Sequence, residues 1–139
     1  MKVVLDTNIL LVCIPKISQY RIIFDKIINE EIYIVVSNDI FTEYFEVFSL
    51  KFGSQIANNI LSYLNLKDNV IKSEIHYKYN LISQDPDDNK FIDVYLNSNS
   101  DYLVTNDKHF NSIKNLQHPE IKIINIDEFV KILIGKTKS

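Results

Sequence analysis

The sequence has few of the residues that build phosphate cradles and disulfides. It holds two glycines and one cysteine in 139 residues. So few glycines exclude the glycine-rich loops that hold phosphates in P-loop and dinucleotide-binding proteins. The lone Cys13 has no partner for an internal disulfide, and its apolar neighbours predict a small buried hydrophobic residue. Any chemistry on phosphates would therefore need another source of positive charge, such as a metal ion.

Long apolar runs and an excess of positive charge are also missing. No run approaches the roughly 18 residues of a transmembrane helix, and the N-terminus lacks the basic region and cleavage site of a signal peptide. We therefore expect a cytoplasmic protein with no membrane association. The net charge of −3 argues against tight, non-specific binding to nucleic acid, which usually requires a basic face.

The composition and the hydrophobic pattern predict one α/β domain over residues 1–139. Hydrophobic residues make up 46% of the chain, which is enough for one core. Apolar runs alternate with segments of helical periodicity, and Ser37 and Asp127 are predicted helix caps. Such alternation predicts a central parallel sheet covered on both faces, a Rossmann-like three-layer α/β/α sandwich. The predicted strands span residues 2–5, 32–36, 70–75, 102–104 and 121–124, and the predicted helices span residues 20–28, 40–50, 54–65, 86–98, 108–112 and 128–133; residues 76–84 are a loop or a frayed helix.

Four acidic residues recur where such a sheet would bring them together. Asp6 closes the first predicted strand and Asp107 follows the strand at 102–104, so both belong at the edge where parallel strands end. Asp88 lies on the apolar face of its helix, and Glu43 borders the apolar face of another. Carboxylates crowded into one cleft repel each other unless a cation neutralises them, and oxygen ligands suit Mg²⁺ or Mn²⁺. The sequence therefore predicts a divalent metal site.

Each acid also has an ordinary structural interpretation. Asp6 and Asp107 could cap the turns that follow them, and an edge residue such as Glu43 is commonly just solvated. Asp88 could be the third helical residue of a capping arrangement in which Asp85 is the cap and Pro86 fills the first position. Glutamate or glutamine is usual at that third position, which favours the ligand interpretation for Asp88.

Four short motifs of the sequence together resemble those of a known family. The likeness is to the PIN-domain ribonucleases, in particular the VapC-like PIN toxins of prokaryotic toxin–antitoxin systems, and it extends in order from residue 2 to about residue 133. It rests on Asp6-Thr7-Asn8, Glu43-Tyr44, Asp85-Pro86-Asp87-Asp88-Asn89-Lys90-Phe91 and Thr105-Asn106-Asp107.

The resemblance implies a function and a set of site residues. The chain would be a Mg²⁺- or Mn²⁺-dependent endoribonuclease, with a cognate antitoxin protein as partner and a tendency to form homodimers. The family's catalytic, metal-binding quartet would be Asp6, Glu43, Asp88 and Asp107, and Asn8 and Thr105 would match the supporting polar positions. The site would hold one or two ions.

The expected mechanism leaves the role of Glu43 open. Asp6, Asp88 and Asp107 would hold one ion directly, and Glu43 would complete the site or bind a second ion. The ion would lower the pKa of a bound water, which then attacks the phosphorus of the RNA backbone. Candidates for holding that backbone are Lys16, Lys90 and Lys108.

His109 departs from the family pattern, because many relatives carry a further acid there. A single exposed histidine beside a short helix is usually incidental, so the sequence leaves open whether His109 replaces a missing ligand. Two other functions also stay open. A haloacid-dehalogenase-like phosphatase would want a second acid two residues after Asp6, where this chain has Asn8. A non-catalytic PIN-like module would bind RNA or a partner without cutting, and failure to bind a divalent metal would indicate it.

Overall fold

The computed structural model describes residues 1–82 and 86–138. Its centre is a five-stranded, all-parallel sheet with the strand order β3-β2-β1-β4-β5. The chain therefore builds the sheet outward from β1 in one direction, then crosses back and adds β4 on the other side. The strands are β1 (Lys2–Leu5), β2 (Tyr33–Val36), β3 (Val70–Lys72), β4 (Tyr102–Val104) and β5 (Ile123–Ile124).

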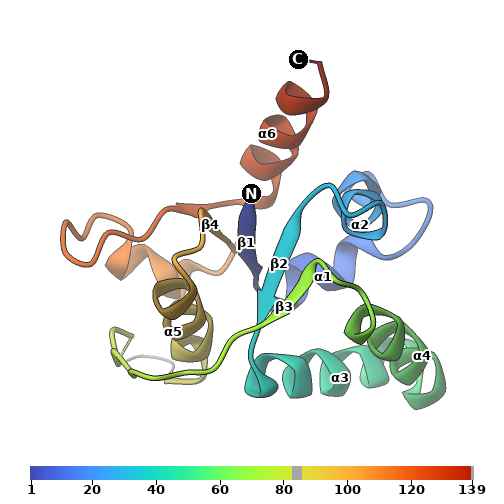
Figure 1. The fold of residues 1–139 in the computed structure, drawn as a ribbon, viewed down its shortest axis with the longest axis horizontal. Helices are drawn as coiled ribbons and strands as arrows, with labels where there is room; N and C mark the ends of the chain where they lie inside the picture. Colours follow the sequence, from blue (N-terminus) through green and yellow to red (C-terminus); the bar gives the residue numbers. More distant parts are fainter. Residues whose placement is uncertain (83–85, 139) are drawn as a thin grey trace.

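The helices cover both faces of the sheet. In Figure 1, α5 lies on one side of the sheet, and α1 and α2 lie on the other. The predicted three-layer α/β/α fold is confirmed. None of the helices in the described part of the chain has both the length and the apolar character needed to cross a membrane. The helices are α1 (Thr7–Cys13), α2 (Arg21–Ile28), α3 (Asn38–Phe52), α4 (Ser54–Asn65), α5 (Asn89–Ser98) and α6 (Ile126–Lys138), with short 3₁₀ helices at η1 (Pro86–Asp88) and η2 (Lys108–Ile113).

The central strand is buried on both of its faces. Val3, Val4 and Leu5 have no exposed surface, as expected for a parallel strand between two helical layers. From α3, the buried Tyr44 hydroxyl donates a hydrogen bond of 2.5 Å to the Leu5 carbonyl. Leu5 pairs with Val104 of β4. β1 and β4 therefore end side by side, and the Tyr44 hydrogen bond holds α3 against the end of β1.

The ends of β1 and β4 lie at the topological switch point of the sheet, where the order in which strands are added reverses. The strand order places the reversal between β1 and β4, and in open parallel sheets ligands bind just beyond the strand ends at such a switch. Asp6 follows β1 directly, and Thr105 follows β4 directly. The fold thus places two of the predicted site residues at the switch point.

Two of the predicted local structures are wrong. The sequence prediction has no helix over residues 7–13, but α1 occupies them, with Asp6 as its cap: the Asp6 carboxylate accepts from the Thr7 N–H at 2.7 Å. The predicted Asp127 cap is also incorrect, because α6 begins at Ile126 and places Asp127 in its first turn. Asn125 caps this helix instead, since its side chain accepts from the Glu128 N–H at 2.8 Å, while the Glu128 carboxylate accepts from the Asn125 N–H at 3.1 Å.

Other boundaries differ by smaller amounts. β3 and β5 are shorter than the predicted strands. The segment predicted as helix 86–98 starts with the 3₁₀ turn η1 and becomes α-helical at Asn89. The predicted Asp85 cap lies outside the described residues.

Cys13 is fully buried as predicted, and burial raises the pKa of its thiol to about 12.

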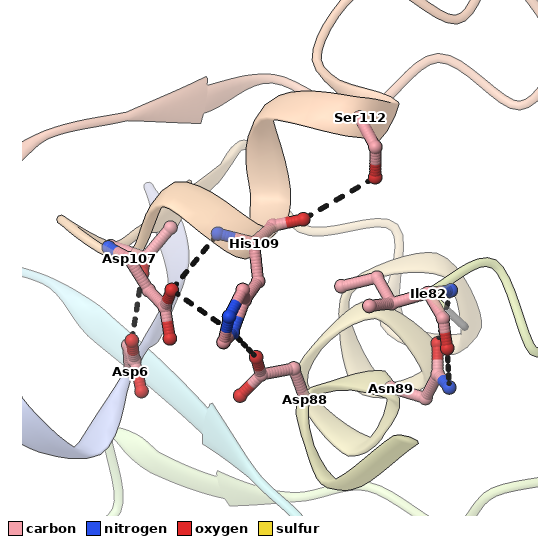
Figure 2. Close-up of polar contacts among 8 residues, drawn as sticks. Asp6, Ile82, Asp88, Asn89, Asp107, His109 and Ser112 are labelled. Carbon is pink, nitrogen blue, oxygen red and sulfur yellow. Dashed lines mark hydrogen bonds and ion pairs between the residues drawn. The ribbon is translucent and has the colours of Figure 1, made fainter. Parts of the chain in front are cut away.

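A strap over residues 76–82 runs along α5 without regular secondary structure. Three α5 side chains, spaced four residues apart, bind its backbone. Asn89 makes two hydrogen bonds of 2.8 Å with the N–H and carbonyl of Ile82 (Figure 2). Asp93 accepts from the Tyr79 N–H at 2.9 Å, and Asn97 donates to the Tyr77 carbonyl at 2.9 Å. These side chains supply the polar partners that a neighbouring strand would otherwise give the backbone.

Replacing Asn89 by alanine should loosen this strap. The variant loses both hydrogen bonds to Ile82, and we expect it to lower the free energy of unfolding by about 1–2 kcal/mol. Backbone amides of residues 76–82 should exchange hydrogen faster than in the unchanged protein. Hydrogen-exchange mass spectrometry checks this, with exposed Asn59→Ala on α4 as the matched control. Equal exchange in both variants would contradict the role given to Asn89.

Candidate metal centre

Asp6 lies at the middle of the site with both of its carboxylate oxygens engaged. Oδ1 accepts from the Thr7 N–H at 2.7 Å, and Oδ2 accepts from the Thr105 hydroxyl at 2.7 Å. The residue is only 8% exposed. Thr105 also accepts a hydrogen bond of 3.0 Å from the Asp107 N–H through the same hydroxyl oxygen. Thr105 therefore connects Asp6, at the end of β1, to Asp107, beyond the end of β4.

Asp88, Asp107 and His109 form the closest group of potential metal ligands found among the described residues. One ligand atom from each lies within 4.8 Å of the others. His109 Nδ1 is 3.3 Å from Asp88 Oδ2 and 3.3 Å from Asp107 Oδ1. Figure 2 shows His109 between the two carboxylates, with Asp6 nearby. Residues from the start of α5 and the start of η2 thus meet at the switch point.

Glu43 reaches the site from α3 and is held on both sides. Its Oε2 accepts a hydrogen bond from the Thr7 hydroxyl, and its Oε1 lies 2.7 Å from the Lys90 ammonium. Thr7 therefore binds Glu43 through its hydroxyl and Asp6 through its N–H. Glu43 is not a member of the 4.8 Å group.

These contacts link eight polar residues in one series, which the backbone of residues 88–90 closes into a ring. Two of the links, from Thr7 to Asp6 and from Asp107 to Thr105, are made by backbone N–H groups. The ring starts and ends on the first turn of α5 and its 3₁₀ lead-in, because Asp88 and Lys90 are two residues apart. Four elements that are far apart in the sequence, at β1, α3, β4 and α5, are thereby fixed to one another around the strand ends. In order, the ring runs Lys90, Glu43, Thr7, Asp6, Thr105, Asp107, His109 and Asp88.

The ring places negative charge where it is costly. Burial raises the pKa of Asp6; the hydrogen bonds from Thr105 and Thr7 oppose this, and the charges of Glu43 and Asp107 add to it. For Lys90, burial lowers the pKa, but the hydrogen bond and charge of Glu43 outweigh it and the pKa is raised. The site thus keeps one ammonium charged and disfavours a buried carboxylate.

The donor set fits a divalent cation. Two carboxylates and one imidazole nitrogen face one another within 4.8 Å, and a further buried carboxylate, Asp6, is joined to them through Thr105. Oxygen-rich sets of this kind suit Mg²⁺ or Mn²⁺, whereas an imidazole ligand is more typical of transition metals than of Mg²⁺. A bound cation would also favour the charged form of Asp6, which the protein alone disfavours.

Two clefts flank the site and differ in charge. The first, of about 400 Å³, borders Glu43 and Lys90 and is mainly acidic, with Asp39 and Glu46 in its wall. The second, of about 370 Å³, borders Asp107 and carries Lys108, Lys114 and the amides of several asparagines. A polyanion would therefore meet less repulsion on the Asp107 side.

The structure brings most, but not all, of the predicted site residues together. Asp6, Glu43, Asp88 and Asp107 all belong to the ring, and so does Thr105, one of the two predicted supporting residues. The other, Asn8, is exposed on α1, and nothing in the structure assigns it a role. His109, whose role the sequence leaves open, lies between two carboxylates.

Sequence reasoning missed Thr7 and the pairing of Lys90 with Glu43. Both contacts join residues that are far apart in the sequence, and neither side chain has a distinctive spacing. The one available signal was position, since Thr7 and Lys90 lie inside the motifs that begin with Asp6 and Asp85.

The fold and this site define an α/β protein with an acidic centre at the switch point of a parallel sheet. The sequence matches the PIN domain over residues 2–109. The chain belongs to the PIN domain family, a family of nucleases that use divalent metals. Membership in this family removes the basis for the haloacid-dehalogenase interpretation.

A solved structure has a fold similar to that of this chain. A search of curated proteins found no match to the sequence. Among solved structures, the fold is similar to a chain in the crystal structure of VapBC2 from Rickettsia felis bound to a DNA fragment from their promoter, with a TM-score of 0.63 and 17% sequence identity. The match covers 90% of this chain and 98% of that chain, so the fold is shared over nearly its whole length.

Proposed function

We propose that this protein is a Mg²⁺- or Mn²⁺-dependent endoribonuclease. The observation that carries the proposal is the group of Asp88, Asp107 and His109, whose ligand atoms lie within 4.8 Å of one another at the switch point of a PIN-family fold. Buried Asp6 joins this group through Thr105. A metal bound there would supply an activated water and positive charge for the phosphate under attack.

The chain's own residues have distinct tasks in this proposal. Asp88 and Asp107 would hold the metal together with Asp6, and His109 would take the place of the acid found in many relatives. Thr105 fixes the Asp6 carboxylate with its hydroxyl and thereby orients it. Lys108 and Lys114 line the cleft beside Asp107 and would hold the phosphates of the RNA on that side.

The proposal extends to partners. The PIN-toxin motifs, and a fold similar to a chain in a VapBC2 structure, support the toxin of a toxin–antitoxin pair. We propose that the whole chain, residues 1–139, acts as one PIN domain in the cytoplasm, binds a cognate antitoxin protein and forms homodimers.

Purified protein should cut a mixed RNA substrate when Mn²⁺ or Mg²⁺ is present and should not cut it in EDTA. Asp88→Asn should lower the rate at least tenfold, because it removes a charged oxygen from the metal group while nearly keeping the side chain's size. Gel analysis of the fragments measures the rate, and mapping of the ends should find 5′-phosphates.

A matched control keeps the test specific. Asp68→Asn changes the same residue type at an exposed position and should cut like the unchanged protein. Cutting that survives Asp88→Asn would overturn the site assignment. Binding of Mn²⁺ with no cutting of any RNA in a diverse pool would instead favour the non-catalytic PIN-like module.

A further inference from the structure

Glu43, an acid of the predicted quartet, has a lysine ammonium beside it. The Lys90 ammonium lies 2.7 Å from Oε1, and the Thr7 hydroxyl donates to Oε2. Both side chains of the ion pair are mostly shielded from solvent, with 21% exposed for Lys90 and 26% for Glu43. Asp6 also has a donor at each carboxylate oxygen, but both of those donors are neutral. Glu43 instead pairs with a charged ammonium, which makes the stronger contact.

Two contacts surround the Lys90 ammonium, whose residue lies at the start of α5. Lys90 belongs to the first turn of α5, two residues after Asp88, and its ammonium also lies 5.9 Å from the centre of the neighbouring Phe91 ring. The same rigid element thus supplies one acid of the metal group and the cation beside Glu43. Lys90 and Glu43 also line the same cleft, whose wall carries the further acids Asp39 and Glu46.

We propose that Lys90 occupies the position of a second cation, so that the site binds one divalent ion and Glu43 is a positioning residue, not a ligand. This inference rests on the proposed function for the identity of the first ion. Glu43, held by Lys90, accepts from the Thr7 hydroxyl, and Thr7 in turn donates its N–H to Asp6. Glu43 thereby acts on the metal group through Thr7 and Asp6. A second divalent ion at Glu43 would be repelled by the adjacent ammonium.

The number of Mn²⁺ ions bound to the intact protein without RNA tests this proposal. Isothermal titration gives the stoichiometry, and electron paramagnetic resonance distinguishes an isolated Mn²⁺ from a coupled pair. We expect one isolated ion per unchanged chain. Lys90→Met keeps the aliphatic stem but removes the ammonium, and it should bind two ions with a coupled-pair spectrum. Lys90→Arg keeps the charge and should bind one.

Two further variants sharpen the test. Lys78→Met removes a positive charge from the same cleft without touching Glu43, so it should still bind one ion. Glu43→Gln in the unchanged Lys90 background should keep the stoichiometry at one and the Mn²⁺ affinity within about tenfold, the lower end of the effect expected for a residue that only orients a ligand. The Glu43→Gln measurement does not depend on whether Lys90→Met folds.

The possible outcomes separate this inference from the proposed function. Two ions in the unchanged protein, one ion in folded Lys90→Met, or loss of Mn²⁺ binding in Glu43→Gln would each overturn the role given to Lys90 and Glu43, while the nuclease proposal would stand. No Mn²⁺ bound by the unchanged protein would overturn both. One ion in the unchanged chain, two in Lys90→Met and one in both lysine controls would support the inference.

Discussion

Replacing Asp6 by asparagine should lower RNA cleavage by about 100- to 1000-fold, the usual cost of losing one preorganised charge-stabilising group, and yet make the metal-free protein more stable. In the proposed mechanism, the loss of activity follows because the neutral amide would not supply the negative oxygen with which Asp6 would hold the metal beside Asp88 and Asp107. The amide oxygen of asparagine can still accept from the Thr7 N–H, so the capping of α1 is kept. The amide NH₂ then replaces the oxygen that accepts from Thr105 and can donate to the Thr105 hydroxyl oxygen instead.

The gain in stability follows from the raised pKa of Asp6. Burial is the main cause, and the charges of Glu43 and Asp107 add to it. A carboxyl group with a raised pKa in the folded state favours folding below its ordinary pKa, and this contribution is lost as the pH rises through the folded-state pKa. Above both the ordinary and the folded-state pKa, the charged Asp6 therefore opposes folding, and an uncharged asparagine avoids that cost.

Denaturant unfolding in EDTA measures this effect at two pH values. The advantage of Asp6→Asn should be clear near pH 7 and should shrink near the ordinary pKa of aspartate, while exposed Asp68→Asn should change little at either pH. Adding Mn²⁺ should stabilise the unchanged protein more than Asp6→Asn, because a ligand stabilises the state that binds it. A variant that is less stable than the unchanged protein at neutral pH would contradict the electrostatic account.

The sequence was sufficient for the parts of the fold that depend on local pattern. The buried strand at residues 2–5 and the helix over Ser54–Asn65 were predicted at their observed bounds. Asp6 and Asp107 could be placed at one sheet edge because parallel strands end at the same side. The helix α1 could not be predicted, because the run from Ile9 to Ile14 is apolar throughout and shows no helical period.

Other features depend on contacts that no spacing reveals. The Lys90–Glu43 pair and the Thr7 hydrogen bond join α5, α1 and α3, and they exist only once the helices have packed. His109 was hardest to interpret, since an exposed histidine gains meaning only from the carboxylates that face it. Asn69 belongs to the same class: it lies in a loop, and nothing in the sequence distinguishes it from exposed asparagines nearby.

Asn69→Ala should lower the free energy of unfolding by about 2–3 kcal/mol, from two lost hydrogen bonds and a small cavity. Asn69 is 2% exposed and precedes the edge strand β3. Its Nδ2 donates to the carbonyls of Ile27 and Ile32, each at 2.8 Å. The side chain thus fastens the loop before β3 to the turn between α2 and β2. Urea unfolding followed by circular dichroism measures the change.

Two companion variants separate the hydrogen bonds from simple loss of volume. Asn69→Asp keeps the size but replaces the donating amide with an oxygen that faces two carbonyl oxygens, so at neutral pH it should destabilise the fold at least as much as Asn69→Ala. Exposed Asn65→Ala, at the end of α4, should change the stability by less than about 0.5 kcal/mol. If Asn69→Asp were as stable as the unchanged protein, the donated hydrogen bonds would not be what holds β3 to the sheet edge. The edge strand would then depend on its backbone pairing with β2 and on its apolar contacts.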